Sequence, residues 1–116
     1  MSTSGLARAI VSVTDLDTAL RFYRDVLGLS VTTRTGDVAF LPIPGGTELM
    51  LHERPSRPSD AAVALSFAVG DVDALTGAAV SAGCGVLDAP ADQPWGERQA
   101  VLTDPDGHVV CLVSRR

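Results

Sequence analysis

The chain contains no lysine, and all nine of its basic residues are arginine. Without lysine it can neither form a Schiff base with a carbonyl substrate nor build a P-loop, so both mechanisms are excluded. It also lacks a Gly-rich phosphate loop and a Gly-x-Ser-x-Gly nucleophile motif. The net charge is −5 and the arginines are scattered rather than gathered in a stripe. We therefore expect neither nucleic acid nor an anionic membrane as a partner.

Cysteine and long apolar runs are also scarce. Cys84 and Cys111 are too few for a disulfide framework and lie in apolar, strand-like surroundings, so we expect two small buried side chains. The longest apolar stretch, residues 61–69 with Ser66 inside it, is too short to cross a bilayer. The first residues show no basic segment followed by an apolar one. We therefore expect no signal peptide and a cytoplasmic location.

The size and composition are those of one ordinary globular domain. The chain has 116 residues, of which 46% are hydrophobic and 20% are charged. A chain of this length can bury a core without metals or disulfides, and this composition excludes disorder. We expect a single domain over residues 1–116.

An internal repeat organises this domain. Residues 13–20 (VTDLDTAL) return 56 residues later as residues 69–76 (VGDVDALT). Each copy follows an apolar, strand-like run and leads into a helical pattern with an apolar face. The helices are expected over residues 15–27 and 71–82, with Thr14 or an aspartate at their starts and Gly28 and Gly83 at their ends.

Short β-patterned segments separated by glycine and proline follow each helix. They cover residues 30–33, 37–41, 47–52, 85–87, 98–103 and 108–113. Each half therefore reads β-α-β-β-β, with module one over about 5–53, a linker over 54–60 and module two over about 61–114. A module with one helix cannot cover both faces of its sheet, so we expect the two modules to pair in an α+β fold.

Three segments of the chain together resemble the vicinal oxygen chelate superfamily, which includes glyoxalase I, bleomycin-resistance proteins, fosfomycin-modifying enzymes and extradiol dioxygenases. They are VTDL running into ALRFYRDVLGL (residues 13–29), FAVGDVDAL (residues 67–75), and WGER (residues 95–98) followed by DPDGH (residues 104–108). The resemblance implies paired βαβββ modules that form a U-shaped, partly open barrel-like sheet.

The resemblance also locates the four positions that hold a metal ion in the metal-using members. They fall on Arg8, Met50, Ala64 and Cys111, with Glu48 or His52 in place of Met50 if the strand register shifts. Arginine stays protonated and offers only donors, so it cannot be a metal ligand. We therefore expect no metal and no cofactor, and no metal-dependent glyoxalase or dioxygenase activity. The chain instead resembles the metal-free branch of bleomycin-resistance proteins, which bind a drug without altering it.

The residues expected to bind a ligand lie on the walls of the implied trough or, in one case, on a loop beside it. They are Arg8, Phe40, Met50, His52, Trp95 and Cys111. Arg8 either meets an acidic or enolate group of the ligand or pairs with Glu48. Trp95 either stacks on the ligand or anchors its loop. His52 is a polar anchor, a general base or a strand-end residue, and no catalytic residue is assigned.

The function expected from these observations is metal-free binding or sequestration of a small molecule by a homodimer. Two alternatives remain open. One is a metal-independent isomerase or lyase that uses Arg8 and His52, and the other is a protein-interaction domain without a ligand. A trough lined by aromatic and polar groups favours a ligand, whereas a filled trough favours the interaction domain.

Overall fold

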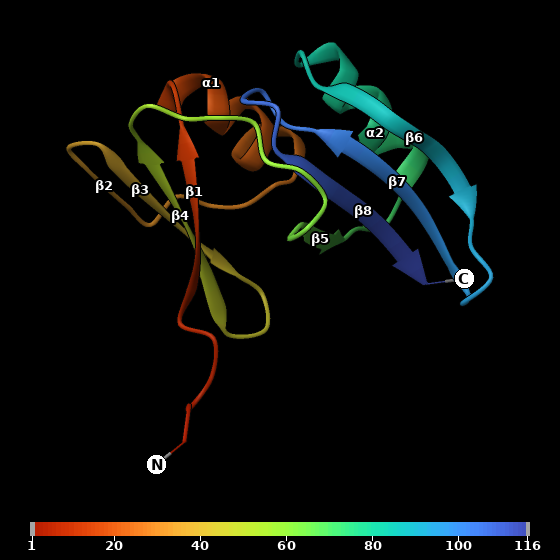
Figure 1. Cartoon of the computed structure of the whole chain (residues 1–116), viewed down its shortest axis with the longest axis horizontal. Coiled ribbons are helices and arrows are strands. Elements are labelled where there is room, and N and C mark those ends of the chain that lie inside the picture. Colours follow the sequence, from red (N-terminus) through yellow and green to blue (C-terminus); the bar gives the residue numbers. More distant parts are fainter. Residues whose placement is uncertain (1, 116) are drawn as a thin grey trace. The chain divides into compact units, whose positions relative to one another are not determined.

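The computed structural model describes residues 2–115 and divides into two compact units, Met1–Ser56 and Arg57–Arg116 (Figure 1). Each unit contains one four-stranded mixed sheet and one helical segment in the order β-α-β-β-β. The prediction of an α+β fold made of two βαβββ modules is confirmed. The boundary between the units follows Ser56 and lies within the linker expected over residues 54–60.

The two sheets have the same topology. In the first unit the strand order is β1-β4-β3-β2, and in the second it is β5-β8-β7-β6. The first strand of each unit runs parallel to the last one, and the other pairs are antiparallel. The strands are β1 (Arg8–Val13), β2 (Thr33–Thr35), β3 (Val38–Ile43), β4 (Thr47–Glu53), β5 (Leu65–Ala68), β6 (Gly85–Asp92), β7 (Glu97–Thr103) and β8 (Val109–Arg115).

Each helix begins at an aspartate of the repeat. Asp15 caps α1 (Leu16–Leu20), because its carboxylate accepts hydrogen bonds from the backbone N of Thr18 at 2.9 Å and from its Oγ1 at 2.7 Å. Asp71, 56 residues later, caps α2 (Val72–Ser81) by accepting from the backbone N of Ala74 at 3.0 Å. The cap of the first helix is therefore Asp15 and not Thr14. Gly28 and Gly83 end the two helical segments with φ of 77° and 95°, the left-handed conformation expected there.

The first helix differs from the expected regular helix over residues 15–27. After α1 the chain continues as a π-helix, η1 (Arg21–Val26), in which the backbone N of Leu27 donates to the carbonyl of Phe22 at 2.9 Å. The wider turn rotates successive residues by a smaller angle. As a result the adjacent Phe22 and Tyr23 both lie fully buried, with their rings edge to face at 4.9 Å. A regular helix with 3.6 residues per turn that places Leu16, Leu20 and Tyr23 on its apolar face leaves Phe22 outside that face.

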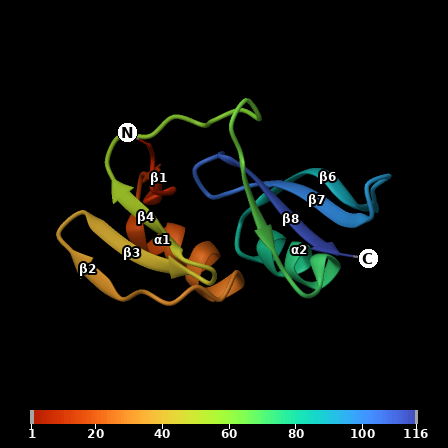
Figure 2. The same cartoon turned by 90° about the horizontal axis from the view of Figure 1, so that it is seen from below.

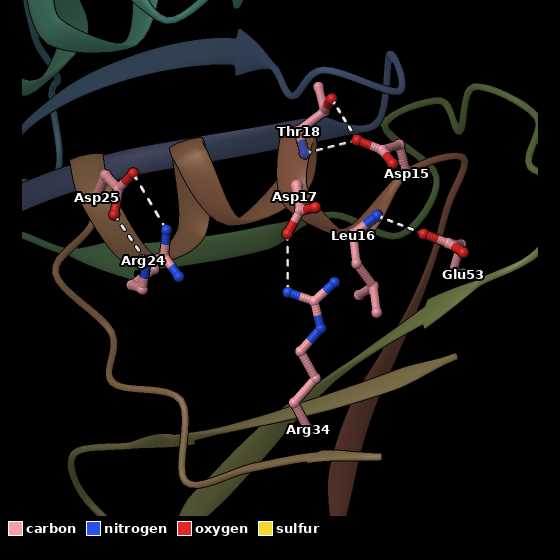
Figure 3. Close-up of polar contacts among 8 residues, drawn as sticks. All are labelled: Asp15, Leu16, Asp17, Thr18, Arg24, Asp25, Arg34 and Glu53. Atoms are coloured by element: carbon pink, nitrogen blue, oxygen red, sulfur yellow. Dashed lines mark hydrogen bonds and ion pairs between the residues drawn. The ribbon is translucent and has the colours of Figure 1, made fainter. Parts of the chain in front are cut away.

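Charged side chains fix the first helix to its sheet (Figure 3). Glu53, at the end of β4, accepts a hydrogen bond from the backbone N of Leu16 at 2.8 Å. Arg34, on β2, donates to Asp17 at 2.8 Å. Both contacts come from the same face of the sheet, so this face is the one that α1 covers. The core of the first unit lies between this face of the sheet and α1.

Three strands, β2, β3 and β6, differ markedly from their expected bounds. β3 continues through Pro42. Its other neighbour, β2, pairs only with Val38–Phe40 and does not extend opposite the proline, so the missing backbone N–H of Pro42 interrupts no pairing on that side. β6 is five residues longer than the segment expected over 85–87. Its pairing with β7 shifts register twice, so its sequence does not alternate between apolar and polar residues. β2 begins at Thr33, where the expected strand over 30–33 ends.

Side chains on alternate strand positions form the core of each unit. In the first unit Leu41, Leu49 and Leu51 are buried on the face of the sheet that α1 covers, and in the second unit Leu102 and Leu112 are buried beneath α2. Figure 2 shows each helix beside the sheet of its own unit. Because successive side chains point to opposite faces, the intervening residues line the face that the helix leaves uncovered. No helix within residues 2–115 is long and apolar enough to span a membrane.

Candidate functional site

The face of the first sheet opposite α1 brings together most of the residues expected to bind a ligand. We call it the open face, and the strand register places its members in rows. Arg8 lies beside Glu48, Ile10 beside Met50, and Ser12 beside His52. Phe40 lies beside Met50 on the other side. The open face consists of Arg8, Ile10, Ser12, Val38, Phe40, Pro42, Glu48, Met50 and His52.

Arg8 is held in a defined position on the open face. Its Nε donates to Oε2 of Glu48 at 2.9 Å, and its Cζ lies 6.0 Å from the ring centroid of Phe40, at the limit of a cation–π contact. The pairing with Glu48 is one of the two alternatives expected for this residue. The two Nη groups have no hydrogen-bond or ion-pair partner among residues 2–115. With 43% of the side chain exposed, this end of the guanidinium remains accessible.

Arg54 is a second arginine of this face, and the sequence analysis did not identify it. Its backbone N donates to the carbonyl of Val13 at 2.9 Å, which continues the pairing of β1 with β4 by one residue. Its Nε donates to Oγ of Ser12 at 2.7 Å. The available signal was its position two residues after His52, because period-two alternation puts both on one face when the strand pairing continues.

His52 and Arg8 lie at opposite ends of the open face. His52 is in the row of Ser12, four residues along the strand from the row of Arg8. At a rise of about 3.3 Å per residue, the two rows are about 13 Å apart. The guanidinium of Arg8 is held on Glu48, so the two side chains extend from opposite ends of the open face.

The structure fixes the strand register that the sequence left open. Met50 lies beside Ile10, and Cys111 lies beside Ser66, which is 56 residues after Ile10. Met50 is therefore the position in the first module that corresponds to Cys111 in the second. Glu48 and His52 are each displaced by one pleat from this position.

The residues at the positions implied for a metal ion do not fit one. Arg8 is a cation, Ala64 has no donor, and a methionine thioether is a poor ligand for the divalent ions that these enzymes use. Burial and the charge of Asp88 raise the pKa of the Cys111 thiol, which keeps it protonated at neutral pH. Within residues 2–115 no three His, Cys, Asp or Glu side chains are grouped to hold an ion.

Two of the expected ligand-binding residues belong to the second unit. Cys111 is half-buried on β8, and Trp95 is 61% exposed in the turn between β6 and β7. The indole N–H of Trp95 donates to Oε1 of Glu97 at 2.7 Å. Cys84 is buried, as expected, and burial together with Asp104 raises its pKa to about 11. Both cysteines are free thiols.

The first unit also contains a hollow of about 310 Å³ at the far end of β3. It has no charged or titratable side chain, so it has little means of orienting a polar ligand. Its lining residues are Gly28, Leu29, Ser30, Pro42, Ile43 and Pro44.

Comparisons with known proteins agree with this architecture. A family model described as the Glyoxalase/Bleomycin resistance protein/Dioxygenase superfamily matches residues 5–112. A Salmonella typhimurium virulence protein is 27% identical in an alignment 112 residues long that covers 87% of this chain and 77% of that protein. A glyoxalase-related enzyme from Fulvimarina pelagi has a TM-score of 0.84 at 24% identity, covering 97% of this chain and 89% of that one. TnmS3, an antibiotic binding protein from a Streptomyces species, has a TM-score of 0.74 at 30% identity, covering 100% and 99%.

Proposed function

The chain belongs to the glyoxalase/bleomycin resistance protein/dioxygenase superfamily, and from this premise we propose that it binds a small molecule on the open face of its first sheet without a metal ion. The superfamily contains both enzymes and binding proteins, so membership alone does not select a function. The proposal therefore rests on the residues of the open face.

The position of Arg8 is the observation that carries the proposal. Arg8 stands where the resemblance implies a metal ligand, and its guanidinium is oriented by Glu48 at 2.9 Å. A permanent positive charge at that place repels a cation and attracts a carbonyl, enolate or carboxylate oxygen of a ligand. Phe40 and Met50 provide apolar surface beside it. One charged anchor on an apolar floor is a common design of small-molecule sites.

A related protein supports the same proposal. TnmS3 is described as an antibiotic binding protein, and it matches this chain at 30% identity over its whole length. Binding of a small molecule is therefore a function that is described for a protein of this fold and similar length. We propose binding or sequestration for this chain on the same basis.

The proposal is tested by screening small molecules against protein treated with a chelator, using thermal shift followed by titration calorimetry. We expect hits whose Kd is unchanged by EDTA and rises about tenfold in Arg8→Gln, the loss expected for a charge-assisted hydrogen bond. Arg24→Gln is the matched control, because Arg24 is an exposed arginine of η1 whose partner is Asp25 at 2.8 Å. Binding or turnover that requires added zinc, nickel, iron or manganese would contradict the proposal.

We also propose that the protein is a homodimer. β6 is an edge strand of the second sheet, and it carries two exposed apolar side chains, Val86 and Leu87, which are 40% and 56% exposed. Exposed apolar groups on a sheet edge are commonly covered by another chain. Sedimentation velocity at working concentrations is expected to give a dimer, and a clean monomer would count against it.

A further inference from the structure

The open face presents two arginines in the same manner. Nε of Arg8 is occupied by Glu48 and Nε of Arg54 by Ser12, at 2.9 and 2.7 Å. In both cases the two Nη groups have no hydrogen-bond or ion-pair partner among the described residues. A guanidinium that is fixed through Nε presents its Nη1 and Nη2 edge to solvent, and this edge matches the two oxygens of a carboxylate.

The two arginines are anchored at opposite ends of one apolar strip. Arg8 is anchored in its own row, and Arg54 is anchored on Ser12, four residues further along β1. These rows are about 13 Å apart. Between them lie Ile10 and Met50, paired across the two strands, with Phe40 beside Met50. The strip is therefore apolar in the middle and cationic at both ends.

The charge of the open face, with Arg54 included, is opposite to that of the chain. Two arginines and Glu48 give a formal net charge of +1 when His52 is neutral, whereas the chain as a whole has −5. Glu48 reduces the attraction at the Arg8 end only. An anion is consequently attracted to this face of an otherwise acidic protein.

We infer that the ligand of the open face is an elongated molecule with an apolar middle and a carboxylate at each end, one bound by the Nη groups of Arg8 and the other by those of Arg54. This inference rests on the proposed function and adds to it the chemical class of the ligand. A monocarboxylate engages one arginine and leaves the other hydrated, so it binds more weakly.

The test uses unbranched α,ω-dicarboxylates of increasing chain length, each compared with the monocarboxylate of equal length by titration calorimetry at low salt. We expect an optimum at an intermediate length, where the dicarboxylate binds about tenfold more tightly than its monocarboxylate partner. Arg8→Gln and Arg54→Gln each remove this advantage, and Arg24→Gln retains it. Added salt weakens the dicarboxylate more than the monocarboxylate.

A fourth variant separates binding from folding. Glu48→Gln keeps an oxygen that accepts from Nε of Arg8 but removes the negative charge beside the bound carboxylate. We expect it to tighten dicarboxylate binding about threefold, a gain that damage to the fold cannot produce. Equal affinities for di- and monocarboxylates, or an unchanged dicarboxylate affinity in Arg54→Gln, would overturn the inference. In that case Arg8-dependent binding of a screened compound would leave the proposed function standing, and its absence would overturn both.

Discussion

Replacing Arg8 by glutamine tests whether this arginine serves ligand binding or the stability of the fold. The structure gives Arg8 one ion pair with Glu48 at 2.9 Å and one distant contact with the ring of Phe40. The two charged side chains are 43% and 30% exposed, so solvent screens their attraction. Such a pair contributes about 0.5 kcal/mol and the ring contact a similar amount. We therefore expect Arg8→Gln to lower the free energy of unfolding by at most about 1 kcal/mol.

The expected stability change of Arg8→Gln is compared with that of a substitution at a buried residue on the neighbouring strand, β4. Leu51 is fully buried beneath α1, and Leu51→Ala is expected to cost about 3 kcal/mol through lost apolar burial and the cavity left behind. Urea unfolding followed by circular dichroism measures both variants, and calorimetry with a screened ligand measures binding. An Arg8→Gln variant as unstable as Leu51→Ala, or one with unchanged ligand affinity, would refute the reasoning.

Three further predictions concern the fold. Asp104 is buried and accepts hydrogen bonds from the backbone N of Asp106 and His108 at 2.9 and 2.8 Å. In urea unfolding, Asp104→Ala is expected to lower the free energy of unfolding by about 3 kcal/mol and Asp104→Asn by about 1 kcal/mol. An alanine variant that loses less stability than the asparagine variant would contradict this. Gly28→Ala is expected to destabilise by about 1 kcal/mol because φ is 77° there, whereas Gly77→Ala inside α2, where a Cβ meets nothing within 4 Å, is expected to stabilise by about 0.5 kcal/mol. Hydrogen bonds from Thr18, Arg24 and Arg98 lower the pKa of Asp15, Asp25 and Asp73 respectively. The stability that these carboxylates contribute is complete above the ordinary carboxyl pKa of about 3.9 and is lost as the pH falls through the lowered pKa values. The Tm is therefore expected to decrease when the pH is lowered below about 4, and an increase would contradict this.

The repeat is the part of the fold that could be predicted best. Two aspartates 56 residues apart, each after an apolar run and before an apolar helical pattern, were enough to place both helices and to identify paired βαβββ modules. Caps and left-handed glycines act through local backbone chemistry, so their signals lie within a few residues of sequence.

The π-helix and the irregular strand β6 could not be predicted for the opposite reason. Phe22 and Tyr23 are both buried in a π-helical turn, whereas a pattern based on 3.6 residues per turn assigns only one of them to the core. The two register shifts of β6 depend on its pairing with β7. Neither cause is visible in the local sequence.

The candidate site was predicted in part. The resemblance located Arg8 and Met50, alternation along the strand puts His52 on the same face as Met50, and Phe40 was expected on the wall of the trough. Arg54 was missed because its role depends on the pairing of β1 with β4 extending beyond the expected end of the strand, which brings Ser12 within 2.7 Å of its Nε. The pairing of Arg8 with Glu48 likewise depends on register, which a sequence with period two specifies only up to one pleat.

The most direct test of metal-free binding on the open face is an NMR titration of chelator-treated, ¹⁵N-labelled protein with a screened ligand. We expect shifts that saturate at one ligand per chain and concentrate on β1, β3 and β4, with the side-chain Nε–H of Arg8 among them. Shifts that appear only after a divalent metal is added, or that leave Arg8 and its neighbours Ile10 and Met50 unchanged, would contradict the account.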